Sequence, residues 1–322
     1  MQIRHLFQRR LTVLIYHRVL AKASDSLFAI PTAVQFEQQL RQMQGFAHFM
    51  SMPEALAQMQ SGRLPANATI ITFDDGYEDN LRVAAPILKK LGLSATFFIA
   101  TDYLDGGMMF NDRVAEAISA CRLTHIDLSS AHASELQTWQ RVDIPPVLAA
   151  RGALAAQLIL AVKHLSAPAR QQAVADIERA CRVYYKDDID ATDDTTTLMM
   201  NPEQLRRLAG MGMHIGAHTC SHPILSRLPE AEARREIQHS RRRLQDLLQS
   251  EVPFFAYPNG VPGQDFAARE VALVKEAGFS HAFSTRQGAC DADSPVFELP
   301  RFTPWSDNYL KMRAQWLRNS LQ

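Results

Sequence analysis

Two adjacent carboxylates and two histidines are the residues of this sequence best suited to chemistry. Asp74 and Asp75 directly follow an apolar, β-branched run in IITFDDGY, and His218 and His222 lie in HTCSH, after the run MHIGA. Neighbouring carboxylates repel each other, so a cation or a proton is expected beside them. Two imidazoles and one carboxylate form a ligand set that suits Zn²⁺ and leaves one position open for water.

The elements that must position these residues follow from the hydrophobic pattern. Short strand-like runs alternate with segments of helical periodicity, which predicts parallel strands joined by crossover helices in an α/β fold. The predicted strands are 11–16, 69–73, 94–100, 213–217, 253–258 and 281–285. Because the carboxyl ends of parallel strands share one edge of the sheet, both motifs should meet there.

Between about 103 and 200 the strand rhythm lapses and the sequence becomes mainly helical. We expect a helical insertion within a single domain of 322 residues. An apolar stripe at helical spacing should pack as core against the strand-containing scaffold. The stripe consists of Leu154, Leu158, Val162 and Leu165.

Charge does not identify a partner. The chain has 34 Lys and Arg against 34 Asp and Glu, so it has no net positive charge to attract nucleic acid. The segment 232–245 holds five arginines, but acidic residues and glutamines are interspersed among them, which is typical of a solvated outer helix. We therefore expect no nucleic-acid partner.

The apolar segments and the cysteines bear on location. The apolar run 11–15 is too short for a secretion signal, and the apolar stretch from Leu148 is interrupted by Arg151 and Gln157. The four cysteines show no paired spacing, as in a reducing compartment. We expect no transmembrane segment and a cytoplasmic location, with peripheral association at the inner membrane as an extension.

TFDDGY and HTCSH resemble the first two motifs of the polysaccharide deacetylase family, which are metal-dependent de-N-acetylases with a distorted (β/α) barrel. The resemblance covers roughly 10–100 and 200–305 and leaves the helical insertion outside. It implies that Asp74 is the catalytic base. It also implies that Asp75, His218 and His222 bind a divalent metal, which agrees with the ligand set inferred from the residues.

The segment FAYPNG (255–260) resembles the third family motif, which lines the substrate groove. The resemblance implies that Tyr257 and Pro258 contact the substrate and that the Tyr257 backbone amide helps to bind the oxyanion.

Two family residues are missing from their usual places. The third motif lacks its arginine, and no Leu-x-His near the C-terminus supplies the usual general acid. His17 in IYHRV and Arg301 in ELPRF end the first and last strand-like runs and could fill these roles. This resembles a family subset with an early histidine, which includes deacetylases of exopolysaccharide export systems. We expect His17 to be the acid and Arg301 the partner of Asp74; the alternative for His17 is a buried histidine satisfied by backbone.

The expected function is metal-dependent removal of N-acetyl groups from an amino-sugar polysaccharide or glycan precursor, with Zn²⁺ as the favoured metal and a lipid-linked saccharide as one candidate substrate. One alternative is hydrolysis of a non-sugar amide or formyl group. Another is a saccharide-binding module without turnover, against which the intact Asp74, Asp75, His218 and His222 count.

Overall fold

The computed structural model of this chain describes residues 9–22, 27–183, 199–304 and 308–320. Its centre is a curled sheet in which every pairing is parallel, so the predicted α/β architecture is confirmed. In spatial order the strands are β1 (Thr12–Tyr16), β3 (Ala68–Phe73), β4 (Thr96–Ile99), β7 (His214–Ala217), β8 (Phe254–Ala256) and β9 (His281–Phe283). Each corresponds to one of the predicted runs, although β3 begins one residue earlier than predicted, at Ala68. A two-residue strand, β2 (His48–Phe49), also pairs with β3 and was not predicted.

The segment 299–302 continues the sheet from β9 back to β1. Leu299 bridges Phe283 of β9, and Phe302 bridges Leu14 of β1. The Phe302 N–H donates to the Val13 carbonyl at 2.7 Å, and the Leu299 N–H donates to the Ala282 carbonyl at 2.9 Å. This segment therefore forms the seam of a distorted barrel.

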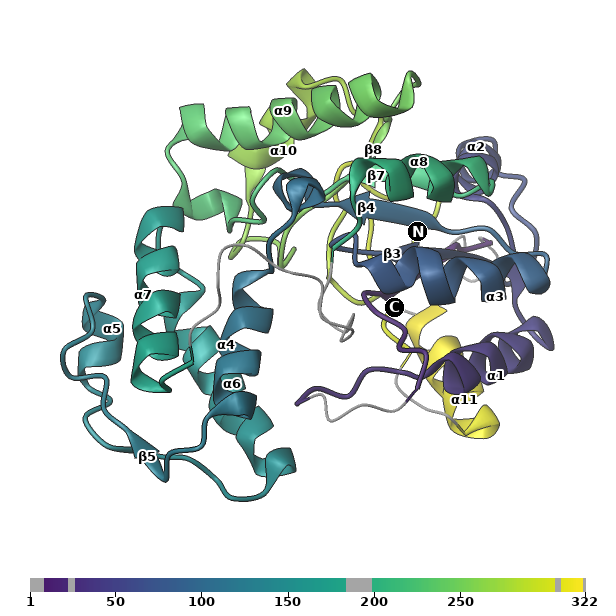
Figure 1. Ribbon diagram of the computed structural model, residues 1–322. Helices are drawn as coiled ribbons and strands as arrows, with labels where there is room; N and C mark the ends of the chain where they lie inside the picture. The colour runs from purple at the N-terminus through teal and green to yellow at the C-terminus, as the bar shows by residue number, and fades with distance from the viewer. Residues whose placement is uncertain (1–8, 23–26, 184–198, 305–307, 321–322) are drawn as a thin grey trace. The chain divides into compact units, whose positions relative to one another are not determined.

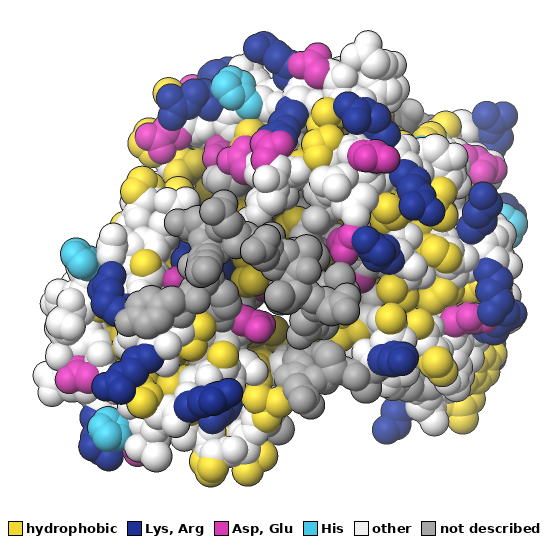
Figure 2. Space-filling model, viewed as in Figure 1, with side chains coloured by type: hydrophobic (Ala, Val, Ile, Leu, Met, Phe, Trp, Pro, Cys, Tyr) yellow, Lys and Arg dark blue, Asp and Glu magenta, His cyan; other side chains and the backbone are white. Residues whose placement is uncertain are grey.

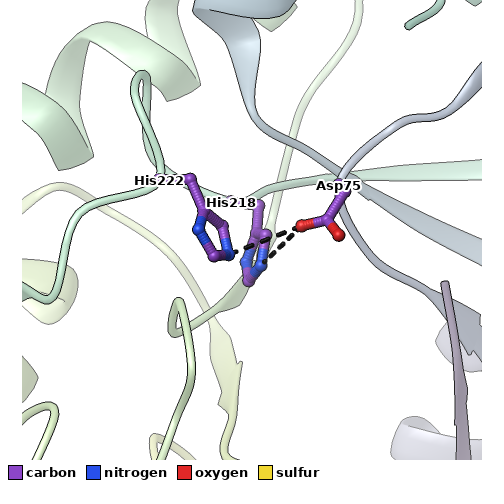
Figure 3. A group of neighbouring side chains, drawn as sticks. All are labelled: Asp75, His218 and His222. Carbon is purple, nitrogen blue, oxygen red and sulfur yellow. Dashed lines mark ion pairs between the residues drawn. The ribbon is translucent and has the colours of Figure 1, made fainter. Parts of the chain in front are cut away.

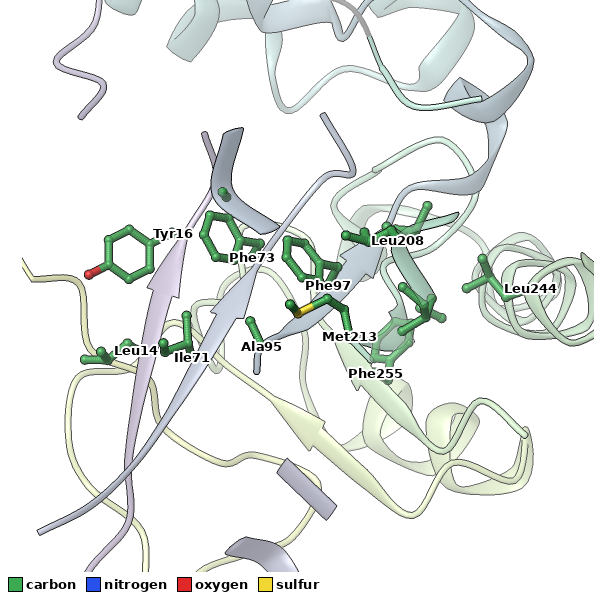
Figure 4. Packing of buried hydrophobic residues seen from close by; sticks show 14 of the residues in the cluster. Leu14, Tyr16, Ile71, Phe73, Ala95, Phe97, Leu208, Met213, Leu244 and Phe255 are labelled. Carbon is green, nitrogen blue, oxygen red and sulfur yellow. The ribbon is translucent and has the colours of Figure 1, made fainter. Parts of the chain in front are cut away.

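Alternate residues of the strands enter two separate cores, as the two-residue period of a strand requires. One set points to the barrel interior, where helix α2 (Met52–Gln60) also contributes: Val13, Ile70, Phe98, Phe254 and Phe283. The other set points outward to the helices: Leu14, Ile71, Phe97, Phe255 and Ala282. Figure 4 shows part of this outer core, in which aromatic rings on neighbouring strands lie against one another.

The outer helices follow one another around the sheet, each in contact with the next (Figure 1). In that order they are α11 (Tyr309–Ser320), α1 (Ala33–Gln44), the π-helical turn η2 (Asn80–Ala84) continued by α3 (Ala85–Lys90), α8 (Pro202–Gly210), α9 (Glu230–Leu248) and α10 (Ala268–Glu276). Helix α8 begins as its sequence predicts, because the Asn201 side chain accepts from the Gln204 N–H and Pro202 follows the cap.

The arginines of α9 lie among acidic residues, and Figure 2 shows the two charges side by side over this helix. Arg241 pairs with Glu251 at 3.2 Å, and Arg243 pairs with Asp105 at 2.6 Å. This helix is an outer one, as its composition predicts.

The described residues among 23–30 and 106–199 group into a second compact unit. Its described elements are α4 (Phe110–Ala120), α5 (Ser134–Gln137), α6 (Leu148–Val162), α7 (Ala167–Ala180) and the antiparallel pair β5 (His125–Ile126) and β6 (Val142–Asp143). The predicted apolar stripe lies in a core made by this unit's own residues, so the expectation that it packs against the barrel scaffold is wrong. That both units form a single domain stays a prediction.

Across the described ranges, no helix is both long and apolar enough to cross a membrane. The four cysteines are free thiols.

Truncating Phe97 should destabilise the barrel. Its side chain is fully buried, and its ring stacks on Phe73 with centroids 4.9 Å apart. Phe97→Ala should therefore lower the free energy of unfolding by about 3–5 kcal/mol, measured by urea denaturation with circular dichroism. Leu310→Ala, at a side chain 72 % exposed, is the control and should change it little. A Phe97 variant as stable as this control would contradict the packing.

Candidate active site

The alternation of inward-facing and outward-facing side chains continues past the ends of the strands. The residues of the site are those that face inward there. Asp74 lies four residues beyond the inward-facing Ile70, and Arg301 lies two beyond the inward-facing Leu299. Gly216 also faces inward, because an added Cβ there would lie 2.5 Å from the ring of the inward-facing Phe98. His218 lies two residues beyond Gly216 and keeps this direction. Residues predicted from strand ends thus share one end of the barrel.

Asp75 leaves the strand direction because its backbone is left-handed, with φ 76°. Gly76 follows with φ 94°, and a Cβ there would meet the Ile99 side chain at 3.2 Å. The Asp75 carbonyl accepts from the Ala100 N–H at 3.2 Å, which fixes the turn to the end of β4. The two aspartates therefore point to different partners although they are adjacent.

Left-handed backbone is concentrated around this end of the barrel. Of the seven described non-glycine residues with positive φ, four lie in its turns. They are Asp75, Thr219, His222 and Asn259. Such conformations cost of order 1–3 kcal/mol each and persist where the surroundings hold them, commonly at functional sites.

Asp75, His218 and His222 form the described cluster with metal-binding geometry (Figure 3). Their ligand atoms lie within 4.8 Å of one another, and the Nε2 atoms of His218 and His222 are 3.6 and 3.4 Å from Asp75 Oδ1. His218 Nδ1 donates to the Ala256 carbonyl at 2.7 Å, which leaves Nε2 facing the carboxylate. Burial lowers the pKa of His218 to about 4, so the ring is neutral near pH 7. Two imidazoles and one carboxylate fit a divalent metal such as Zn²⁺.

Asp74 is held in a buried bidentate ion pair with Arg301. Arg301 Nη1 and Nη2 donate to the two carboxylate oxygens at 2.7 and 2.8 Å, and its Nε donates to the Ser284 carbonyl at 2.9 Å. Burial by itself would raise the pKa of Asp74, but the Arg301 guanidinium, assisted by His218, outweighs burial and holds this pKa at about 2. Asp74 is therefore ionised near neutral pH.

His17 directly follows β1 and has an exposed side chain, so it is not the buried histidine of the alternative interpretation. Its carbonyl accepts from Asn80 Nδ2 at 2.8 Å, and the Val19 N–H donates to Asp79 Oδ1 at 3.2 Å. Surrounding protein atoms lower the pKa of His17, while the charge of Asp74 acts in the opposite direction. The ring is thus within electrostatic reach of Asp74.

Tyr257 does not lie as the family resemblance implies. Its N–H donates to the Phe283 carbonyl at 3.1 Å in the ladder between β8 and β9, so this amide is not available to an oxyanion. Its ring is buried and stacks on Phe266 with centroids 3.7 Å apart. Pro258 is also buried and has no N–H. The predicted oxyanion role of the Tyr257 amide is therefore wrong, whereas the substrate contacts of Tyr257 and Pro258 stay a prediction.

Sequence reasoning missed Glu236 of α9, which accepts hydrogen bonds from the turn between the two histidines. Oε2 accepts from the Cys220 and Ser221 N–H groups, and Oε1 accepts from the Ser221 hydroxyl. Its segment indicates only an amphipathic outer helix, so no local signal marks this contact.

The comparison with protein families decides the classification. The polysaccharide deacetylase model matches residues 61–145 and 159–281, more than half of the chain. The chain belongs to the polysaccharide deacetylase family. The match extends into the helical stretch, which the sequence analysis had placed outside the resemblance. His17 and Arg301 lie beyond the matched residues.

Individual relatives agree with the family assignment. YxkH of Bacillus subtilis (strain 168), whose protein name also refers to polysaccharide deacetylase, is 32 % identical over 92 residues. These residues are 28 % of this chain and span only 32 % of the relative's own length.

Solved structures show the shared fold. The Streptococcus pyogenes deacetylase PplD in complex with acetate has a TM-score of 0.59 at 18 % identity, with 92 % of each chain covered. IcaB from Ammonifex degensii has a TM-score of 0.58 at 19 % identity, with 96 % of this chain and 97 % of that chain covered. A de-N-acetylase from Aggregatibacter actinomycetemcomitans has a TM-score of 0.54 at 14 % identity, with 91 % and 94 % covered. The distorted barrel of the family is therefore confirmed for this chain.

Replacing Arg301 should destabilise the metal-free protein in a pH-dependent way. The pKa of Asp74 in the folded state, about 2, lies below its ordinary value of 3.8. A depressed pKa gives stability that is present above the unfolded value and lost as pH falls from about 4 to 2. Arg301→Gln should cost about 3–5 kcal/mol at pH 7, because it leaves a buried charge uncompensated.

The measurement is urea unfolding of the parent and the variant at pH 7 and pH 3. The difference in free energy of unfolding between the parent and the variant should be smaller at pH 3 than at pH 7. At pH 3 the unpaired Asp74 of the variant is protonated, which removes the uncompensated charge. Arg235→Gln, on the exposed face of α9, is the control. A pH-independent difference would show that Arg301 contributes by packing alone.

Proposed function

We propose that this chain is a metal-dependent hydrolase that removes N-acetyl groups from an amino-sugar polysaccharide or glycan precursor. The observation that carries the proposal is the Asp75, His218 and His222 cluster beside an ionised Asp74, at one end of a family barrel. The acetate bound to PplD and the de-N-acetylase among the similar folds support acetyl as the group removed. The free thiols support a reducing compartment, where a lipid-linked precursor is one candidate substrate.

Asp75, His218 and His222 would hold the metal. When bound, a divalent metal polarises the amide carbonyl and lowers the pKa of its water to about 7. Asp74 then acts as general base and takes a proton from the attacking water. Arg301 keeps this carboxylate charged and fixes its orientation through both oxygens.

The developing oxyanion also needs a donor from the protein. Because the Tyr257 N–H is engaged and Pro258 has none, the next amide in this turn is that of Asn259. Asn259 is exposed and left-handed, with φ 58°. Within the described part of the chain its N–H donates to no other group. We assign the oxyanion contact to this amide.

His17 is the proposed general acid, which protonates the leaving amine. Its exposed ring within reach of the Asp74 charge supports this role. A lowered pKa makes the protonated ring a stronger acid, but reduces the fraction that carries a proton at neutral pH. Turnover should therefore fall as the pH rises through the lowered pKa of His17, that is, in a range that begins below 6.5.

Acetate release from N-acetylglucosamine oligomers, with and without a chelator, tests the function. Release that the chelator stops and Zn²⁺ restores is the expected result. Release only from a non-sugar amide or formyl substrate would identify a different amidohydrolase. Oligomer binding without any release would identify a saccharide-binding module.

The two adjacent aspartates should have separable roles. Asp75→Asn should weaken metal binding, because it removes the charged ligand oxygen. Asp74→Asn should keep the metal and lose roughly 10²–10⁴-fold in kcat, because it removes the base. Metal content and acetate release are measured on the same samples. Metal loss in the Asp74 variant alone would reverse the assignment.

Loss of His17 should affect substrates according to their leaving group. His17→Ala should keep the metal and lower kcat on the acetylated sugar, because the amine must be protonated as it departs. An activated ester, whose leaving group needs no proton, should be hydrolysed almost as well as by the parent. His48→Ala, at an exposed residue of β2, is the matched control. Equal losses on amide and ester would assign His17 a positioning role instead.

A further inference from the structure

The turn that carries the two histidines has a strained backbone. Thr219 has φ 66° and His222 has φ 56°, so two non-glycine residues in the left-handed region lie within four positions. Thr219 Oγ1 accepts from the His222 N–H at 3.1 Å, which accounts for one local contact. A turn of this kind keeps its shape where the surroundings determine it.

The segment after β4 donates hydrogen bonds that help to hold the histidine turn in shape. The Thr101 N–H donates to the Thr219 carbonyl at 3.1 Å, and the Asp102 N–H donates to the Cys220 carbonyl at 3.0 Å. These bonds hold the carbonyl groups of the turn and leave its N–H groups to another acceptor.

Glu236 is that acceptor. Its Oε2 accepts from the Cys220 N–H at 2.8 Å and from the Ser221 N–H at 2.9 Å, and its Oε1 accepts from the Ser221 hydroxyl at 2.7 Å. A single half-buried side chain on a long helix thus holds the centre of the turn, with one histidine on each side.

We propose that Glu236 is a positioning residue that fixes the separation of His218 and His222 and thereby sets the metal affinity of the site. This inference rests on the proposed metal-dependent function. Glu236 acts through the backbone of the turn, and its carboxylate is occupied by three donors of that turn. Groups that orient metal ligands typically change metal affinity by 10–100-fold when they are removed.

The test is the Zn²⁺ affinity of the full chain, measured by competition with a chromophoric chelator. Glu236→Ala should bind Zn²⁺ about 10–100-fold more weakly than the parent. Glu236→Gln keeps an oxygen for the two N–H groups, and Ser221→Ala keeps both of those bonds. Each of these variants should stay within a few-fold of the parent. Glu232→Ala, at an exposed acid one turn earlier on α9, is the matched control and should not change the affinity.

Thermal melting of each variant, with and without Zn²⁺, separates positioning from a general loss of stability. A structural role alone would lower the melting temperature of the metal-free protein and leave Zn²⁺ affinity unchanged, which would overturn the inference. If Glu236→Gln bound Zn²⁺ as weakly as Glu236→Ala, the negative charge of Glu236 would determine the Zn²⁺ affinity, and the hydrogen bonds that position the turn would not. That result would also overturn the inference.

The outcomes distinguish this inference from the proposed function. If the parent binds Zn²⁺, His218→Ala abolishes binding and Glu236→Ala binds as the parent does, the inference fails and the function stands. A parent that binds no Zn²⁺ and releases acetate in the presence of a chelator would overturn both.

Discussion

A buried ion pair between a carboxylate and a guanidinium determines how this site is built. Asp74 is 2 % exposed and Arg301 is 1 % exposed, and two charges can be buried so completely only when each satisfies the other. Arg301 lies on the seam segment that joins β9 to β1, 227 residues away from Asp74 in sequence. The ion pair therefore contributes to barrel closure as well as to the state of the proposed base.

The same pair explains how two neighbouring aspartates coexist. Asp74 continues the inward strand register to Arg301, whereas the left-handed backbone of Asp75 turns its carboxylate toward two histidines. Each negative charge has its own partner, so their mutual repulsion is compensated on both sides. The cost is backbone strain at Asp75 and in the histidine turn, which hydrogen bonds from neighbouring elements offset.

The sequence could predict whatever depends on periodicity and on strand ends. The buried runs locate six strands, and the shared edge of a parallel sheet brings Asp74, His218 and Arg301 together. The register between neighbouring strands could not be predicted in this way. The Tyr257 amide is engaged because Ala256 pairs with Phe283, and nothing in FAYPNG records this pairing. Glu236 could not be predicted either, because its contact depends on how α9 packs against a turn that is distant in sequence.

The π-helical turn η2 gives the segment after the aspartates an unusual tolerance of one change in length. A π turn holds one residue more than an ordinary α-helical turn. It begins at Asn80, directly after Asp79, and these two residues contact the end of β1 through His17 and Val19. Deleting one residue between 81 and 84 would let an ordinary helical turn replace the π turn with little rotation of Asp79 and Asn80 relative to α3, because the wider turn already accommodates the extra residue. The same deletion from an ordinary helix would rotate the preceding residues by about 100°. In an evolving lineage, a gap of one residue should therefore be tolerated better in this segment than in the outer helices around it.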